Sequence, residues 1–195
     1  KMKNLIAFAL LMSSYSVLAQ ISDKHDYIWT FGYASNTVDS SFGGTDLNFN
    51  NGGVEAIYQY RNMEIEVTNS SIADTAGNLL FYTNGCYIAD ATHEMMENGD
   101  SINYPGWGYD THCKDYDGYR HNQGSMILPQ PDSADIYYLF HTKTTLMEIP
   151  PFDFDLLGTP FLFTKIDMSK NNGLGAVVEK NQFVLLANDG RLGRK

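Results

Sequence analysis

Apolar and aromatic residues occur along the chain in short runs that are separated by turn residues. After residue 19 no run keeps the 3.6-residue period of an amphipathic helix. Short apolar runs bounded by Gly, Asn, Asp and Pro are typical of β-strands. The pattern therefore predicts an all-β protein made of antiparallel strands.

The predicted strands follow directly from these runs. They cover residues 27–33, 54–60, 63–68, 71–74, 79–83, 86–90, 125–129, 136–141, 161–167 and 183–186. Residues 35–53 and 99–124 lack such a pattern, and we expect them to be long surface loops. Trp29 lies inside an aromatic run, and we expect it in the core.

Residues 71–90 carry the clearest turn signals. Gly77 and Asn78 tolerate a positive φ, so the chain can reverse tightly there. Asn84 and Gly85 offer a second reversal a few residues later. This segment is therefore predicted to form a three-stranded antiparallel meander.

A second hairpin is predicted between residues 125–129 and 136–141. Pro129 should end its first strand, because proline cannot donate a hydrogen bond to a sheet. The hairpin turns are spaced by about 50 residues, similar to the longer repeat periods of β-propellers.

The N-terminal residues have the pattern of a secretory signal peptide. Lys1 and Lys3 precede an apolar run over residues 5–12, and Ala19 suits a signal peptidase site. The run is shorter than the roughly 20 residues that cross a bilayer. We expect residues 1–19 to be removed and the mature chain to be secreted or held at the cell surface.

The composition is consistent with sheets, and the charge bears on the class of partner. The chain has 13 Tyr and 11 Phe, which suits sheets, and a formal net charge of −10. Nucleic-acid phosphates are matched by basic patches, and this sequence has none. A nucleic-acid partner is therefore not expected.

Cys86 and Cys113 are the two cysteines of the chain. Export to an oxidising compartment favours a disulfide between them. Two reduced, buried thiols are the alternative.

Several motifs match one known family when they are taken together. They are YIWTFG at residues 27–32, GNLLFYTNG at 77–85, HEMMENG at 93–99, QGSMILP at 123–129, YYLFH at 137–141, IDM at 166–168 and GLG at 173–175. In this order they resemble the N-terminal, WD40-like β-propeller region of secreted surface proteins of the type IX secretion and gliding motility-associated kind. The resemblance extends to about residue 186.

This resemblance implies that residues 20–195 form antiparallel meander blades of a partial β-propeller used for surface adhesion or display. It implies no catalytic residues. Family members continue into further blades, so we expect the chain to be truncated at its C-terminus and those blades to be its partners. Closed propellers have about four to eight blades. Alone, the fragment is expected to aggregate through free strand edges or to fold incompletely.

A calcium site is one hypothesis for residues 110–118. Asp110, Asp115 and Asp117 precede Gly118, which echoes part of a calcium loop, although the terminal bidentate Glu is missing. A solvated acidic loop is the alternative. No other cofactor is expected.

Other chemistries fit less well. His112 and His121 could ligate zinc together with Cys113 or Asp110, but their spacing is not that of a zinc motif. No Gly-x-Ser-x-Gly or His-Glu-x-x-His motif is present. Asp153 and Asp155 could serve as a glycosidase pair, but their sequence spacing does not fix their separation in space.

Ligand binding is predicted for the aromatic residues Trp107, Tyr109 and Tyr116. An exposed aromatic ring can stack on a sugar or anchor a protein partner, whereas a hydrophobic plug is the alternative. The sequence thus suggests a non-catalytic extracellular surface module that binds or displays a glycan, protein or matrix ligand. The alternatives are a secreted polysaccharide-active hydrolase or lyase on a propeller scaffold, and a structural spacer.

Overall fold

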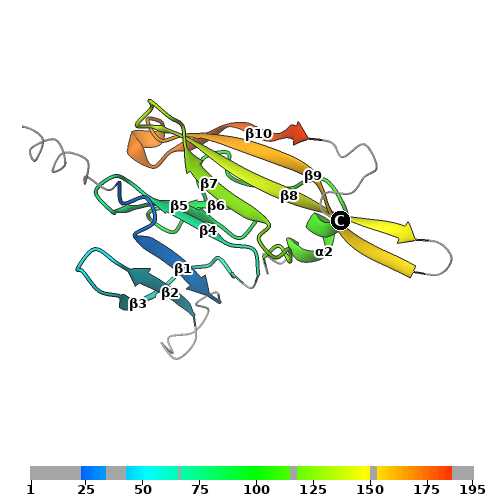
Figure 1. Ribbon diagram of the computed structural model, residues 1–195, viewed down its shortest axis with the longest axis horizontal. Helices are drawn as coiled ribbons and strands as arrows, with labels where there is room; N and C mark the ends of the chain where they lie inside the picture. Colours follow the sequence, from blue (N-terminus) through cyan, green and yellow to red (C-terminus); the bar gives the residue numbers. More distant parts are fainter. Residues whose placement is uncertain (1–22, 34–42, 66, 115–117, 150–152, 186–195) are drawn as a thin grey trace, which may run out of the picture.

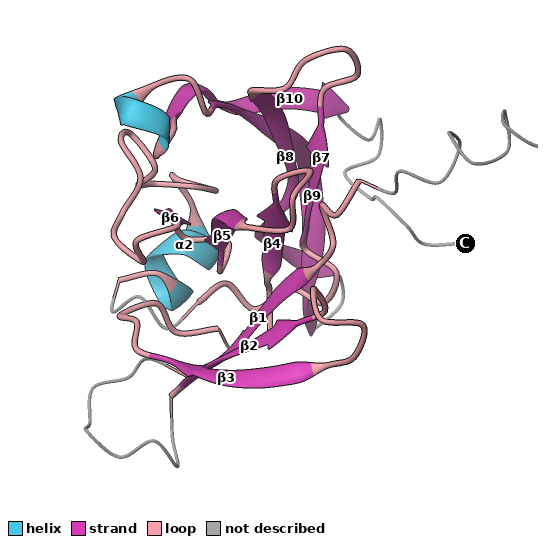
Figure 2. Ribbon diagram, turned by 90° about the vertical axis from the view of Figure 1, so that its left-hand side faces the viewer, coloured by secondary structure: helices cyan, strands magenta, loops and turns pink. Residues whose placement is uncertain are grey.

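A computed structural model describes residues 23–33, 43–65, 67–114, 118–149 and 153–185. Within these ranges the chain forms ten strands in three antiparallel sheets, with one short α-helix (Figures 1 and 2). The first sheet contains β1 (Ile28–Gly32), β2 (Gly44–Asn48) and β3 (Glu55–Gln59). The second contains β4 (Ser70–Ala73), β5 (Leu79–Thr83) and β6 (Ile88–Asp90). The third contains β7 (Ser125–Pro129), β8 (Ile136–Ile149), β9 (Asp153–Asp167) and β10 (Ala176–Leu185).

Each sheet is a meander in which consecutive strands are neighbours. The antiparallel, mainly β architecture confirms the fold class at this level. The described strands do not close into a ring of sheets.

The first strands of the three sheets are neighbours, with β4 between β1 and β7. The Ser71 hydroxyl donates a hydrogen bond of 2.8 Å to the carbonyl oxygen of Ile28 in β1. On the other side, the Ser70 and Ser125 hydroxyl oxygens are 2.7 Å apart. The second sheet therefore lies between the other two.

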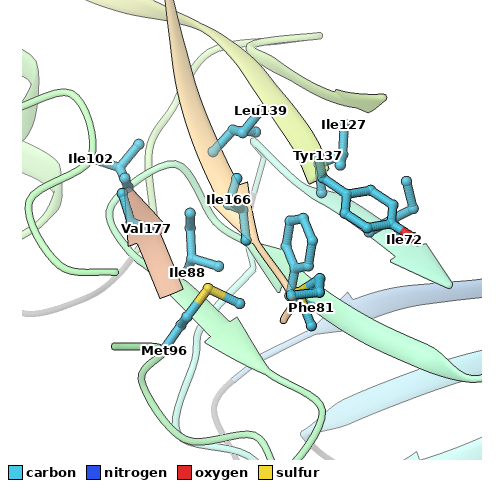
Figure 3. Packing of buried hydrophobic residues seen from close by; sticks show 11 residues of the cluster. Ile72, Phe81, Ile88, Met96, Ile102, Ile127, Tyr137, Leu139, Ile166 and Val177 are labelled. Carbon is cyan, nitrogen blue, oxygen red and sulfur yellow. The ribbon is translucent and has the colours of Figure 1, made fainter. Parts of the chain in front are cut away.

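The larger hydrophobic core fills the space between the second and third sheets. Phe81 of β5 and Ile88 of β6 are fully buried there and point toward Ile166 of β9 (Figure 3). Their sequence neighbours Tyr82 and Ala89 belong to a second buried cluster on the opposite face. This alternation follows from the two-residue period of a strand, so the middle sheet is buried on both faces.

The predicted meander of residues 71–90 is confirmed. Gly77 has a φ of 90°, the positive value that its turn requires. The Asp74 side chain stabilises the same turn by accepting hydrogen bonds from the backbone N–H groups of Ala76 and Asn78. The hairpin of β7 and β8 is confirmed as well, and Pro129 is the last residue of its first strand.

The strand predicted for residues 63–68 is wrong for the described part of that segment. Only Ile65 pairs, in an isolated bridge to Gly32. Met63 and Ile65 are apolar because they fill the second buried cluster, and burial without a ladder partner gives the same sequence pattern as a strand.

The two segments expected to be loops contain regular structure. Strand β2 lies within residues 35–53, where pairing with β1 and β3 overrides a composition poor in strand formers. Helix α2 (Trp107–His112) lies within residues 99–124. Strands β8, β9 and β10 are also longer than predicted, since each continues beside a neighbour past its apolar run.

The prediction that Trp29 belongs to the core is wrong, because its side chain is 47% exposed. Its neighbours Ile28 and Thr30 are buried, so the alternation of β1 turns Trp29 to the outer face of the first sheet.

The predicted signal peptide, residues 1–19, lies outside the described residues. In the part of the chain that the structure describes, none of the helices is both long and apolar enough to cross a membrane.

Candidate ligand-binding site

Helix α2 and the loop before it carry a group of aromatic side chains, which we call the α2 aromatic surface: Tyr104, Trp107, Tyr109 and His112. The Tyr104 ring meets the Tyr109 ring edge to face, with centroids 5.2 Å apart. Trp107 meets His112 in the same way at 5.6 Å. Tyr104 and Trp107 remain 51% and 39% exposed, so these two rings offer aromatic area to solvent. Tyr109 is half-buried and packs against the second buried cluster.

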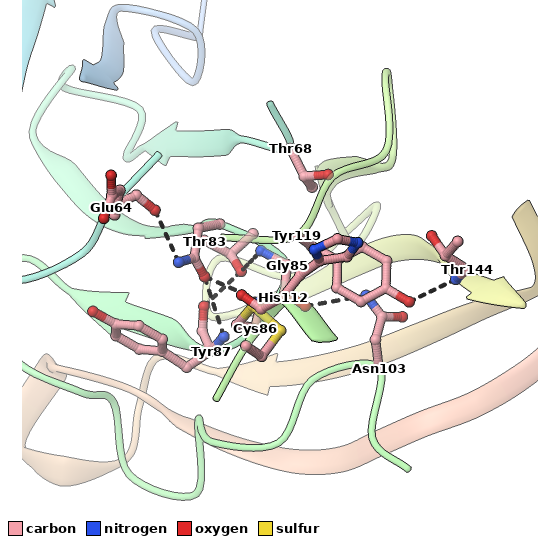
Figure 4. The surroundings of a disulfide bond; sticks show 12 residues. Glu64, Thr68, Thr83, Gly85, Cys86, Tyr87, Asn103, His112, Tyr119 and Thr144 are labelled. Atoms are coloured by element: carbon pink, nitrogen blue, oxygen red, sulfur yellow. Dashed lines mark hydrogen bonds between the residues drawn. A yellow bond between two sulfur atoms is a disulfide. The ribbon is translucent and has the colours of Figure 1, made fainter. Parts of the chain in front are cut away.

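A disulfide holds the end of α2. Cys86 and Cys113 are bonded, with their Cα atoms 5.4 Å apart, which confirms the predicted pairing. Cys86 lies just before β6, and Cys113 follows the last residue of α2. Figure 4 shows the His112 and Tyr119 side chains beside this bond. The disulfide thus fixes the aromatic residues of α2 to the middle sheet.

A second anchor is Tyr119, which is fully buried beneath α2. Its hydroxyl oxygen accepts a hydrogen bond of 2.6 Å from the backbone N–H of Thr144 in β8. A Cβ atom at Gly108 would overlap this hydroxyl group, so the helix can approach only because residue 108 is glycine. Burial raises the pKa of Tyr119, which therefore stays neutral and hydrogen-bonded at physiological pH.

A third anchor holds the loop before α2. The Asn103 Oδ1 atom lies 2.7 Å from Nδ1 of the buried His141, and the Asn103 side-chain amide donates to the carbonyl of Gly85. Nε2 of His141 lies 3.0 Å from the Thr164 hydroxyl in β9. Burial lowers the pKa of His141 to about 3, so the imidazole is neutral. This network ties the loop to β8 and β9.

Two charged groups border the α2 aromatic surface. The Lys143 side chain lies against Gly106, and Asp110 is exposed on α2. Burial lowers the pKa of Lys143, and the negative charge of Asp110 acts in the opposite direction. An ammonium donor and a carboxylate acceptor therefore lie at the start of α2, the helix that carries Trp107 and Tyr109.

The structure brings together some of the site residues predicted from the sequence. Trp107, Tyr109 and Asp110 all lie on α2. Tyr116, Asp115 and Asp117 lie outside the described residues, so the calcium hypothesis stays a prediction. In the described part of the chain, no His, Cys, Asp or Glu side chains gather in threes to form a potential metal site.

The structure also bears on the residues of the zinc and glycosidase hypotheses. Because Cys113 is bonded to Cys86, it has no thiolate to offer zinc. Asp153 and Asp155 belong to β9. Sequence reasoning did not identify Lys143, since nothing in the sequence indicates that β8 passes beside residue 106.

No protein-family model, curated protein or solved structure matches this chain. The geometry of the site is therefore the basis of the functional proposal.

Proposed function

We propose that this chain is a non-catalytic extracellular surface module whose α2 aromatic surface binds a glycan. The observation that carries the proposal is that Trp107 stays exposed on a segment held by a disulfide, by Tyr119 and by the His141 network. A fixed aromatic ring binds at low entropic cost, because little freedom remains to be lost.

The chemistry of the surface fits a sugar. Aromatic rings stack on the apolar faces of sugar rings, and a few placed polar groups set orientation in a binding site. Lys143, which lies against Gly106, and Asp110 on α2 supply one donor and one acceptor for sugar hydroxyls at the start of the same helix.

The fold supports the role of a surface module. We propose that the three meanders are consecutive blades of a β-propeller-like array, since the first strands β1, β4 and β7 are neighbours, as the inner strands of blades are. The disulfide is compatible with export to an oxidising compartment.

The test is a glycan array probed with the labelled chain and two variants. Trp107→Ala and Tyr109→Ala are expected to weaken binding about tenfold, because loss of an aromatic stack costs about 1.4 kcal/mol. Tyr60→Ala removes a 60% exposed ring elsewhere and is the matched control.

Urea unfolding of each variant separates lost binding from lost folding. If Trp107→Ala binds as tightly as the unchanged chain, the proposed site is wrong. Turnover of a polysaccharide by the unchanged chain would contradict the non-catalytic role and favour a hydrolase or lyase.

A further inference from the structure

A second aromatic depression lies on the first sheet, and we call it the Trp29 cleft. It has a volume of about 440 Å³ and is lined by Asp26, Tyr27, Trp29, Phe49 and residues 52–54. Small-molecule sites in proteins commonly measure about 300 to 1,000 Å³ and combine aromatic walls with a few polar groups. The cleft shares no lining residue with the α2 aromatic surface.

The central ring of this cleft is held in a fixed orientation. The indole Nε1–H of Trp29 donates a hydrogen bond of 2.8 Å to the carbonyl oxygen of Asp26. The Phe49 ring packs against the indole, with centroids 5.2 Å apart and a tilt of 55°. Trp29 is nevertheless 47% exposed, so a preformed aromatic platform faces solvent.

The rim of the cleft leaves room for a ligand. Gly52 and Gly53 lie in the loop between β2 and β3, and a Cβ atom built on either meets nothing within 4 Å. A ligand on Trp29 can therefore approach the backbone at this turn without a steric barrier.

The charges around the cleft favour a neutral guest. Asp26 lines the cleft and is exposed, and its negative charge disfavours an anion. The Lys24 ammonium lies 5.2 Å from the Tyr27 ring centroid and makes a cation–π contact with that ring. It also donates a hydrogen bond to Asn50 Oδ1. A second cation at Tyr27 would be repelled.

We propose that the Trp29 cleft binds a neutral sugar ring, stacked on the Trp29 indole and hydrogen-bonded through its hydroxyl groups to the Asp26 carboxylate. A neutral polyol can stack on the indole and donate hydrogen bonds to the carboxylate at the same time. The site does not depend on glycan binding at the α2 aromatic surface.

Tryptophan fluorescence tests the site directly, because Trp29 and Trp107 are the two tryptophans of the chain. In Trp107→Phe the emission reports Trp29 alone, and in Trp29→Phe it reports Trp107 alone. Maltohexaose, mannohexaose and a β-1,3-glucan hexasaccharide are titrated up to about 10 mM, which detects millimolar dissociation constants. A saturable change in Trp107→Phe is expected with at least one of them.

Asp26→Ala in the Trp107→Phe background is expected to weaken that titration about tenfold, whereas Asp23→Ala, three residues earlier, should leave it unchanged. No change in Trp29 emission with any oligosaccharide overturns the inference. It is also overturned if choline saturates the cleft while the sugars do not, or if Trp29→Ala changes only the oligomeric state in size-exclusion chromatography. A response in Trp29→Phe alone supports the α2 aromatic surface and contradicts the Trp29 cleft.

Discussion

The Arg61 guanidinium donates a hydrogen bond to the Asp46 carboxylate, with 3.0 Å between Nη1 and Oδ1. The Arg61 side chain is fully buried, and that of Asp46 is 11% exposed. The same guanidinium donates to the carbonyl oxygen of Phe31 and lies 5.4 Å from the ring centroid of Tyr82. One cation thus joins β1 and β2 of the first sheet to β5 of the second.

Arg61→Met is expected to lower the free energy of unfolding by about 3 to 5 kcal/mol, because it leaves Asp46 buried without its cation. Urea unfolding followed by circular dichroism measures the loss. Glu179→Gln is the control, since it breaks the partly exposed pair with Lys165 and should cost about 1 kcal/mol or less. Equal losses in the two variants would contradict the structural role of Arg61.

Gly108→Ala is expected to destabilise the protein by about 1 to 3 kcal/mol, although alanine favours helices over glycine by about 1 kcal/mol. The added methyl group would overlap the Tyr119 hydroxyl beneath α2. Thermal unfolding measures the effect. In a Tyr119→Phe background the same change should cost clearly less, and an undiminished cost would show that the overlap is not its cause.

Removal of the disulfide by Cys86→Ser with Cys113→Ser is expected to cost about 3.5 kcal/mol on the chain-entropy model for a separation of 27 residues. Glycan binding at the α2 aromatic surface should also weaken, because the end of α2 loses its link to the middle sheet. Treatment of the unchanged chain with dithiothreitol should reproduce the loss of stability. Treatment of Trp29→Phe, whose emission reports Trp107 alone, should reproduce the loss of glycan binding.

The free energy of unfolding should decrease as the pH is lowered, because His141 is buried in its neutral form. Burial lowers its pKa to about 3 in the folded chain, against about 6.5 in the unfolded chain. Between these values the unfolded state binds a proton that the folded state does not. The stabilising contribution is thus complete above about pH 6.5 and falls below it by about 1.4 kcal/mol per pH unit.

The check is urea unfolding of the unchanged chain and of His141→Gln between about pH 7 and about pH 5, above the range where carboxylates titrate. His93 and His121 also have pKa values lowered by burial, and the unchanged chain and His141→Gln both retain these two residues. Any difference between the two proteins in the slope of unfolding free energy against pH is therefore due to His141. Parallel pH profiles would contradict its assignment as a buried neutral group.

Short-range features of this chain could be predicted from its sequence. The turns at Gly77 and Gly85 depend on local backbone freedom, and both residues have the positive φ that such turns need. The antiparallel meander therefore follows from neighbouring residues alone. The pairing partner of Cys86 also follows, because Cys113 is the other cysteine of the chain, whereas the structure decided that the two are bonded rather than reduced.

The candidate site was predictable only in outline. The density of aromatic residues around Trp107 indicated a surface that could bind a ligand, but no helical period indicated α2. Its six residues are held by the disulfide and by Tyr119 rather than by helix propensity, since so short a helix is marginal alone.

The sequence by itself determined the strand-rich character, the local turns and the one cysteine pair, because each depends on a short stretch or on composition. Tertiary structure alone decided that β2 is a strand, that Trp29 faces solvent and that Lys143 lies beside Gly106 at the start of α2. These features depend on which distant segments pack together. An alternating strand has two faces, and only its packing partners decide which face is buried.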